Sequence, residues 1–342
     1  MKCPVCGDGC IQDAPAVLES LASVFSRCPR CTFRVLDKSA PLKGRYYGTP
    51  CECGKRFIDE VFAHLYVILV EEGIFSGSEP LRAVGSPLLH PGFFIAGPPF
   101  LPPGSLVLLS PLVTESAARR MITEVPEVRG VVRSGDFVPG ATDPSLATVP
   151  RSYELLAGCD VRAGIFPTGA GPLVIYTQQS QMHIEFPRLE NPKIQSVERH
   201  IAAQRPTWCV DACSGAGTLG LCAARHGIPG VILNDAWYSA AFWSATNLHV
   251  NRMFFQVEGV RIHLSFREMS MHPVGRDPVK VAEASGGQSI AVYHGDFRQL
   301  WKVLPREPVC AVLDLFEKSD TRMTEAAMKE WQSRVPGEVF IP

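Results

Sequence analysis

The sequence lacks a strong charge of either sign. Its 342 residues contain 33 Lys and Arg against 34 Asp and Glu, which gives a formal net charge of −1 at pH 7. A chain so close to neutral has no overall field that would attract nucleic acid or an anionic membrane. Any partner of that kind therefore requires a local basic patch.

The sequence also lacks a long uninterrupted apolar run. Its most apolar segment, residues 57–75, carries acidic residues near both ends, and its apolar residues recur at helical spacing. This pattern predicts a buried amphipathic helix, because the segment is too short and too charged to span a bilayer. The amino terminus has no apolar stretch typical of a signal peptide. We therefore expect a cytoplasmic protein without a membrane partner.

Internal repeats and low-complexity segments are absent from the sequence as well, and the length allows two or three domains. We expect a cysteine-rich, zinc-ribbon-like module (1–56) and a small α+β domain that contains a β-α-β unit (57–150). A β-hairpin lead-in (151–195) should follow, because it has two or three strand-like runs that are broken by the turn sequence TGAGP. The rest (196–342) alternates between strand and helix patterns, which predicts an α/β domain with a parallel sheet covered on both faces.

Cysteine is the clearest positive signal. The sequence has twelve cysteines, and seven of them lie within the first 53 residues. Without a secretory signal, such clustered pairs indicate metal ligands rather than disulfides. Three short knuckles are present: Cys3 with Cys6, Cys28 with Cys31, and Cys51 with Cys53. The first two have the spacing of a tetrahedral zinc site, and such a metal would stabilise a module that has little core.

The sequence leaves open how these cysteines are divided among metal ions. The pair Cys51 and Cys53 could replace either of the other two knuckles, or could complete a second site together with Cys10. A [4Fe–4S] cluster on Cys3, Cys6 and Cys10 is an alternative to zinc.

A glycine-rich turn opens the alternating region, with the spacing G-x-G-x-x-G at Gly215, Gly217 and Gly220. In a parallel sheet, such a turn lets a ligand approach the backbone at the carboxyl ends of the strands. Asp211 ends the strand just before the glycines, and an anionic pyrophosphate would be unfavourable beside it. The charge therefore favours a ligand that is cationic at this point.

Two further acids end the next strands. Asp235 is placed to accept hydrogen bonds from ribose hydroxyls, and Asp296, followed by Phe297, is placed to contact an adenine. S-adenosylmethionine carries a sulfonium and an ammonium and no phosphate. These carboxylates therefore favour it over a dinucleotide.

Four motifs carry a family resemblance: VDACSGAGTLGL, VILNDAWYSAAFWSATNLHVN, HGDFRQL and AVLDLF. Together they resemble class I S-adenosylmethionine-dependent methyltransferases, in the form found in tRNA guanine methyltransferases, where the second motif closes on Asn-x-x-x-Asn (Asn247 and Asn251). The resemblance covers about residues 190–320 and implies a Rossmann-like methyltransferase sheet.

The same resemblance implies roles for individual residues. Asp211, Gly215 and Gly217 would hold the methionine part of the cofactor, and Asp235 would bind its ribose. Adenine would lie against Asp296 and Phe297. The catalytic position would be Asp314, which would face the methyl group and the incoming acceptor.

The sequence departs from the family pattern at two places. The fourth strand lacks an Asn-Pro-Pro-Tyr type motif, which disfavours methylation of an exocyclic adenine or a glutamine nitrogen. Few residues follow Phe316, so we expect a sheet shortened at its carboxyl-terminal edge. An uncovered edge invites aggregation, and we expect it to be covered by residues 160–190, by a partner chain or in a dimer.

The acceptor is not fixed by these motifs. Between Arg27 and Arg56 there are eight Lys and Arg against two Asp and Glu, with the aromatics Phe33, Tyr46, Tyr47 and Phe57 interleaved. A basic zinc module with aromatics is typical of an RNA-binding surface. We therefore favour methylation of structured RNA such as tRNA. One alternative is methylation of a protein side chain, and another is a non-catalytic zinc-ribbon scaffold with a decayed methyltransferase domain.

Overall fold

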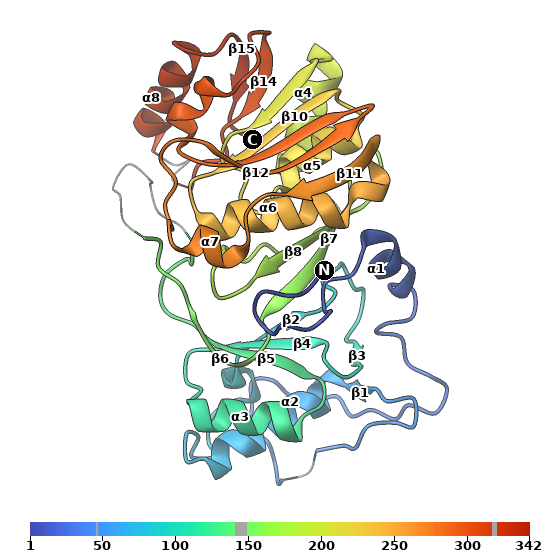
Figure 1. The fold of residues 1–342 in the computed structure, drawn as a ribbon. Helices are drawn as coiled ribbons and strands as arrows, with labels where there is room; N and C mark the ends of the chain where they lie inside the picture. The colour runs from blue at the N-terminus through green and yellow to red at the C-terminus, as the bar shows by residue number, and fades with distance from the viewer. Residues whose placement is uncertain (46, 141–148, 317–319) are drawn as a thin grey trace.

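The computed structural model describes residues 1–45, 47–140, 149–316 and 320–342, and it has an upper and a lower half joined by a hairpin (Figure 1). Tyr46, one of the interleaved aromatics, lies outside the described residues. Within these ranges, no helix is both long and apolar enough to cross a bilayer.

The upper half contains a sheet whose described strands follow the spatial order β11-β12-β13-β10-β9-β14-β15. Five of them run parallel: β9 (Trp208–Asp211), β10 (Gly230–Asp235), β13 (Ser289–His294), β14 (Val309–Val312) and β15 (Gly337–Phe340). The strand order reverses between β9 and β14, as in a doubly wound fold. The sequence prediction of a shortened, Rossmann-like parallel sheet is confirmed.

A hairpin that the sequence did not predict extends the other edge of this sheet. It consists of β11 (Val257–Ile262), the short helix α7 (Phe266–Ser270) and β12 (Val279–Gly286). β12 pairs antiparallel with β13, and β11 pairs antiparallel with β12. This segment has many polar and charged residues, so its strand pattern is weak in the sequence.

Helices cover both faces of the sheet. On one side lie α4 (Pro192–Gln204), α5 (Thr218–Arg225) and α6 (Tyr238–Val250), and on the other lie the 3₁₀ helix η4 (Phe297–Lys302) and α8 (Thr321–Gln332). Alternation along β10 explains the two cores, because Val231 and Leu233 join the cluster with α5 and α6 whereas Ile232 joins the cluster with α8.

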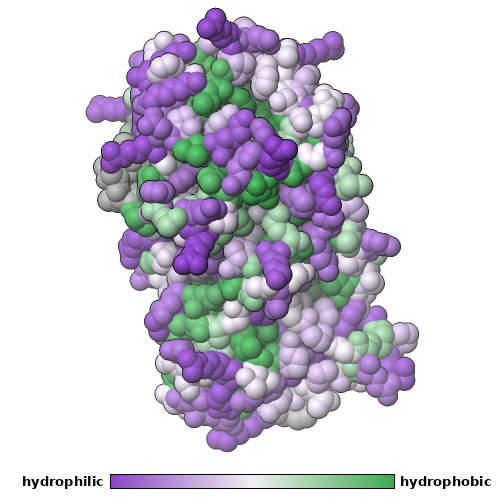
Figure 2. Space-filling view, in the orientation of Figure 1, coloured by the Kyte–Doolittle hydropathy of each residue, from purple (hydrophilic) through white to green (hydrophobic). Residues whose placement is uncertain are grey.

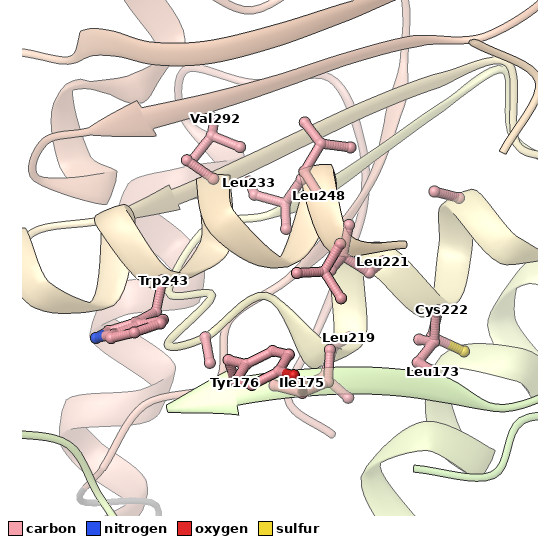
Figure 3. Packing of buried hydrophobic residues seen from close by; sticks show 14 of the residues in the cluster. Leu173, Ile175, Tyr176, Leu219, Leu221, Cys222, Leu233, Trp243, Leu248 and Val292 are labelled. Carbon is pink, nitrogen blue, oxygen red and sulfur yellow. The ribbon is translucent and has the colours of Figure 1, made fainter. Parts of the chain in front are cut away.

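The hairpin β7 (Val161–Phe166) and β8 (Leu173–Gln178) confirms the predicted turn at TGAGP. Figure 3 shows α6 between the sheet and β8, with Trp243 and Leu248 of α6 close to Tyr176 and Leu233. The expectation that residues 160–190 cover the shortened sheet edge is wrong, because their apolar side chains are buried against α5 and α6 instead. Among the described residues, no strand pairs with the outer edge of β15.

The lower half is built on a sheet with the order β2-β4-β5-β6. Its strands are β2 (Ser86–Leu89), β4 (Leu106–Ser110), β5 (Val128–Arg133) and β6 (Glu154–Gly158), and its helices are α2 (Ile58–Glu71) and α3 (Glu115–Glu124). β4 and β5 are parallel with α3 between them, which is the predicted β-α-β unit. A short antiparallel pair, β1 (Arg56–Phe57) and β3 (Phe100–Leu101), completes this half.

Two elements lie across the domain boundaries expected from the sequence. β6 comes from the segment 151–195, yet it pairs with β5 of the small sheet. Helix α1 (Ala14–Ser20) belongs to the cysteine-rich segment, yet its buried residues join the core of the upper half, whereas Phe25 joins the core of the lower half. The boundaries at 56, 150 and 195 stay predictions.

Candidate functional site

The reversal of strand order places β9 beside β14 at the centre of the sheet. Asp211 is the last residue of β9, and Asp314 follows β14 by two residues. In a doubly wound sheet, ligands bind at the carboxyl ends of the strands on either side of such a reversal. The carboxylates that the sequence singled out are therefore at the position where this fold forms a ligand site.

The glycine turn connects β9 to α5. Gly215 has φ +52° and Gly217 has φ +91°, and both lie in the left-handed region that favours glycine. A Cβ atom at Gly217 would lie 3.0 Å from Leu233 and Ser244 side chains, whereas one at Gly215 would meet nothing within 4 Å. Gly217 therefore serves close packing, and Gly215 leaves backbone open to a ligand.

Asp211 is fully buried and is fixed by the turn. Its Oδ2 accepts a hydrogen bond of 2.7 Å from the backbone N–H of Gly220, and its Oδ1 has no partner among the described residues. Burial raises the pKa of Asp211 to about 8, although the bond from Gly220 acts in the opposite direction. A buried carboxylate oxygen without a partner is suited to receive a cationic group.

Asp235 ends β10 and also bonds to the turn. Its Oδ2 accepts from the N–H of Gly215 at 2.9 Å, and its Oδ1 accepts from the N–H of Trp237 at 2.8 Å. Burial raises the pKa of Asp235 to about 6. A carboxylate has about four acceptor positions, so two remain for other donors such as hydroxyl groups.

Asp296 follows β13 and caps the next helix. Its Oδ1 accepts from the N–H of Arg298 at 2.9 Å, at the start of η4. Phe297 is buried in the same core as α8, and the Arg298 guanidinium lies 4.7 Å from its ring centre. Both residues lie at the predicted strand end, and their contact with an adenine stays a prediction.

Asp314 forms an ion pair that the sequence did not predict. Its Oδ2 lies 2.8 Å from Nζ of Lys193, at the start of α4. Burial opposes the charge on Lys193, but the Asp314 carboxylate outweighs it and raises the pKa of Lys193. The ammonium group stays charged and also acts electrostatically on Asp211. Lys193 therefore interacts with carboxylates on both sides of the strand reversal, Asp211 at the end of β9 and Asp314 after β14.

Two further residues that the sequence did not single out brace the turn. Buried Asn234 donates through Nδ2 to the carbonyl oxygens of Ala212 (3.0 Å) and Gly295 (2.8 Å), and the Ser244 hydroxyl donates to the carbonyl of Gly215 at 2.9 Å. A polar residue within the buried strand β10 was a signal for Asn234. Ser244 lies within a helix, and no signal in the sequence pointed to it.

The segment 256–288 reaches the same strand ends. Its residues between α7 and β12 bond to the ends of β10 and β13, because Gly275 N–H donates to the carbonyl of Ala236 (2.8 Å) and Asp296 N–H donates to the carbonyl of Arg276 (2.9 Å). The segment 256–288 therefore forms one wall of the candidate site.

The seven amino-terminal cysteines fall into two groups. Cys28, Cys31, Cys51 and Cys53 come together, with sulfur separations of 3.6 Å for Cys28–Cys51, 3.7 Å for Cys28–Cys31 and 3.6 Å for Cys31–Cys53. Four thiolates around a zinc ion at about 2.3 Å lie about 3.8 Å apart in a tetrahedron. This group fits zinc.

The remaining cysteines form a second group, which brings Cys3, Cys6 and Cys10 together with Cys159. Of the arrangements that the sequence left open, the structure has the one in which Cys51 and Cys53 take the place of Cys3 and Cys6 beside Cys28 and Cys31. Sequence spacing could not identify Cys159, which lies far along the chain. All four sulfurs lie within 4.8 Å of one another, which suits one shared ion and is too close for a cluster with one iron per thiolate.

Comparisons with known proteins gave few matches. No protein-family model matches the chain, and no curated protein matches it. Among solved structures, TYW2 of Pyrococcus horikoshii in complex with MeSAdo is 17% identical, with 82% of this chain and 78% of that chain covered and a TM-score of 0.38. Trm1 of Pyrococcus horikoshii with S-adenosyl-L-methionine is 21% identical, with 44% of this chain covered and a TM-score of 0.30. This chain spans 36% of that Trm1 chain.

Proposed function

We propose that the upper half binds S-adenosylmethionine at the ends of β9, β10 and β13 and that the protein is a methyltransferase. The observation that carries this proposal is the set of carboxylates around the glycine turn: Asp211 is buried, Asp235 is half-buried, and both bond to the backbone of the turn. Their raised pKa values mean that burial makes their negative charges costly without a compensating cation. A phosphate-bearing nucleotide would add negative charge at the same place.

Each residue of the site would bind a different part of the cofactor. Asp211 would hold the ammonium group and lie near the sulfonium, with Oδ1 as its free acceptor. Asp235 would accept from the ribose hydroxyls, and the exposed backbone at Gly215 would let the cofactor approach. Asp296 and Phe297 stay the candidates for the adenine.

S-adenosylmethionine supplies an activated methyl group on its sulfonium, and transfer requires the acceptor atom in line with that bond. The protein's contribution is positioning and exclusion of water. Asp314 and Lys193 lie beside β14, where an acceptor would enter, and the ammonium of Lys193 holds the Asp314 carboxylate in place. We propose Asp314 as the catalytic position, because its carboxylate is placed to accept a proton from the acceptor.

The acceptor we propose is structured RNA, most simply a tRNA. The segment between α1 and β1 forms the projection at the lower right of Figure 1, and Figure 2 shows mainly hydrophilic residues there. Phe33 is 47% exposed on this segment, and the Arg27 guanidinium lies 5.7 Å from its ring centre. An exposed aromatic with adjacent cations is suited to stack on an unpaired base. The group Cys28, Cys31, Cys51 and Cys53 would hold this surface in shape through zinc.

Transfer of labelled methyl groups tests the proposal. The full-length protein is incubated with methyl-labelled S-adenosylmethionine and bulk cellular RNA and protein, and portions are then digested with nuclease or protease. We expect label that nuclease releases and protease does not. Asp235→Asn should lower incorporation, and Asp136→Asn, at an exposed position after β5, should not.

The other outcomes identify the alternatives. Label that only protease releases would replace RNA with a protein side chain as the acceptor. No label, together with no heat of cofactor binding in calorimetry, would support a non-catalytic scaffold and contradict the proposal. A partner chain or dimer at the free edge of β15 stays a prediction, and so does a cytoplasmic location.

A further inference from the structure

The first 20 residues form an amino-terminal arm that lies on the upper half, beside the hairpin (Figure 1). The arm's Gln12 N–H donates to the hydroxyl of Tyr176 at 3.0 Å, and the Asp13 carboxylate pairs with both terminal nitrogens of Arg252 at 2.6 and 2.7 Å. Its one helix, α1, has seven residues, which is too short to be stable without tertiary contacts. The arm therefore depends on what anchors it.

Three of the four cysteines in the second group come from this arm, and the fourth does not. Cys159 lies in the connection Cys159–Asp160 between β6 and β7. β6 belongs to the sheet of the lower half, and β7 belongs to the hairpin that packs on the upper half. The group therefore joins the arm to the point where the chain passes from one half to the other.

The sulfur atoms of this group have the spacing of one tetrahedral ion. Cys3 and Cys159 are 3.8 Å apart, and Cys6 and Cys10 are 3.7 Å apart, against about 3.8 Å for zinc tetrathiolate. A disulfide requires about 2.05 Å, and all twelve cysteines are free thiols here. Cys3 and Cys159 are buried, so an ion at this place would be largely shielded from solvent.

A half-buried arginine next to the group has two side-chain nitrogens without a hydrogen-bond partner. Arg129 accepts through its backbone carbonyl from the N–H of Cys159 at 2.8 Å, so the two residues are adjacent across the sheet. Its Nε and Nη2 are buried without a hydrogen-bond partner, and it forms no ion pair with any residue in the described ranges. Burial lowers the pKa of neighbouring His90 to about 3, and the positive charge of Arg129 adds to this shift. Burying N–H groups of a charged guanidinium without a partner is costly.

One bound metal ion accounts for both features. Four thiolates around a divalent cation carry a net charge of −2, so a guanidinium beside them gains a counter-charge. Partners of this kind, which bond to ligands rather than to the metal, orient the ligands and strengthen metal binding. We infer that Cys3, Cys6, Cys10 and Cys159 bind one zinc ion that clamps the amino-terminal arm to the connection between the halves, with Arg129 as its charge partner.

The clamp has a consequence for the whole chain. Five residues after α1, Phe25 stacks on Phe93 in the lower half at 5.6 Å. The chain thus leaves the clamp on one half and enters the other within a few residues. The zinc ion therefore limits how far the lower half, with its half-buried group of Cys28, Cys31, Cys51 and Cys53, moves relative to the ends of β9 and β10.

Metal analysis of the purified full-length protein tests the site. We expect two zinc ions per chain in the native protein, one in Cys159→Ser, one in Cys53→Ser and two in the control Cys310→Ser, which removes a buried cysteine outside both groups. Cobalt(II) exchange should give the absorption of two tetrathiolate centres per chain and of one in Cys159→Ser. Two zinc ions in Cys159→Ser would overturn the proposal.

Hydrogen exchange tests the clamp independently of any catalysis. In Cys159→Ser, backbone protection should fall in residues 1–20 and around residues 159–166, and it should persist in residues 28–53. Cys53→Ser should show the opposite pattern. If both segments keep native protection when chelator and reductant remove all metal from the native protein, then the clamp does not exist.

A second variant covers the case in which Cys159→Ser fails to fold. Arg129→Met keeps all four ligands and removes the counter-charge, and Arg119→Met serves as a surface control. Loss of a partner of this kind typically weakens metal binding about 10- to 100-fold. Chelator competition should therefore release one of the two zinc ions more readily in Arg129→Met than in Arg119→Met. Equal release in the two variants would contradict the assigned role of Arg129.

Discussion

The side-chain amide of Asn247 hydrogen-bonds to both backbone groups of Tyr176. Its Oδ1 accepts from the N–H at 2.7 Å, and its Nδ2 donates to the carbonyl at 2.9 Å. Asn251 bonds in the same way to Val174, at 3.0 and 2.7 Å. Four residues of helix rise about 6 Å, and two residues of strand rise about 6.6 Å, so the two amides match alternate residues of β8. Helix α6 thereby satisfies the open edge of the hairpin.

Replacing Asn247 should destabilise the upper half. Asn247→Ala leaves the N–H and the carbonyl of Tyr176 without these partners. It also removes the donor to the carbonyl of Ala216 in the glycine turn, to which Asn247 Nδ2 donates at 2.9 Å. An unsatisfied buried polar group costs about 1–3 kcal/mol. We expect a loss of at least this size in the free energy of unfolding by urea. Gln332→Ala, at the exposed end of α8, should change it little, and equal effects of the two variants would contradict this account.

The stability of the cofactor-free protein should fall as pH rises. In the folded chain the pKa values of Asp211 and Asp235 are about 8 and about 6, against about 3.9 in an unfolded chain. The folded state therefore holds protons that the unfolded state releases. The protons on Asp211 and Asp235 stabilise the folded state fully below about pH 4. This contribution is lost as pH rises through the pKa of Asp235, about 6, and then that of Asp211, about 8. Urea unfolding between pH 5 and 9 measures this loss, and Asp211→Asn should reduce its slope.

Cofactor affinity should change with pH in the opposite direction. The ammonium and sulfonium of S-adenosylmethionine require an ionised Asp211, and the ribose hydroxyls donate best to an ionised Asp235, so binding must displace the protons of both carboxyls. We expect calorimetry to show tighter binding as pH rises from 6 to 8. Because protons are released, the observed heat should depend on the ionisation enthalpy of the buffer. Affinity that is flat over this range would show that these two carboxylates do not contact the cofactor.

Asp235 should contribute strongly to cofactor affinity. Asp235→Asn keeps the shape of the side chain but removes its negative charge. The carboxylate accepts from the N–H groups of Gly215 and Trp237 in the native protein. A hydrogen bond to a charged group contributes about 1.5–3 kcal/mol, which corresponds to about 10- to 100-fold in the dissociation constant. Asp37→Asn is the matched control in calorimetry. A change of less than threefold in Asp235→Asn would place the cofactor elsewhere.

The exposed ring of Phe33 should contribute to RNA binding. Phe33→Ala removes a stacking surface, which is typically worth about 1–3 kcal/mol per base. Val35 is a matched control, because it is 65% exposed on the same segment and has no ring. RNA binding measured at several salt concentrations should weaken in Phe33→Ala at every concentration and stay unchanged in Val35→Ala. The two variants should bind the cofactor equally.

The amino-acid sequence by itself determined the local elements of this protein. The apolar periodicity of residues 57–75, the turn at TGAGP and the regular alternation after Trp208 gave the helix α2, the hairpin β7–β8 and the parallel sheet. The glycine spacing and the acids at the strand ends marked the candidate site for the same reason. Short-range spacing fixes which side chains a turn or a strand end presents together.

Only the tertiary structure decided which distant residues meet. Cys159 joins Cys3, Lys193 pairs with Asp314 and Asn247 bonds to Tyr176, and in each case the partner lies on another element. The weak strands β11 and β12 likewise form because β13 offers an open edge. Such contacts depend on how packed elements are oriented in space, and the spacing of residues along the chain carries no record of that orientation.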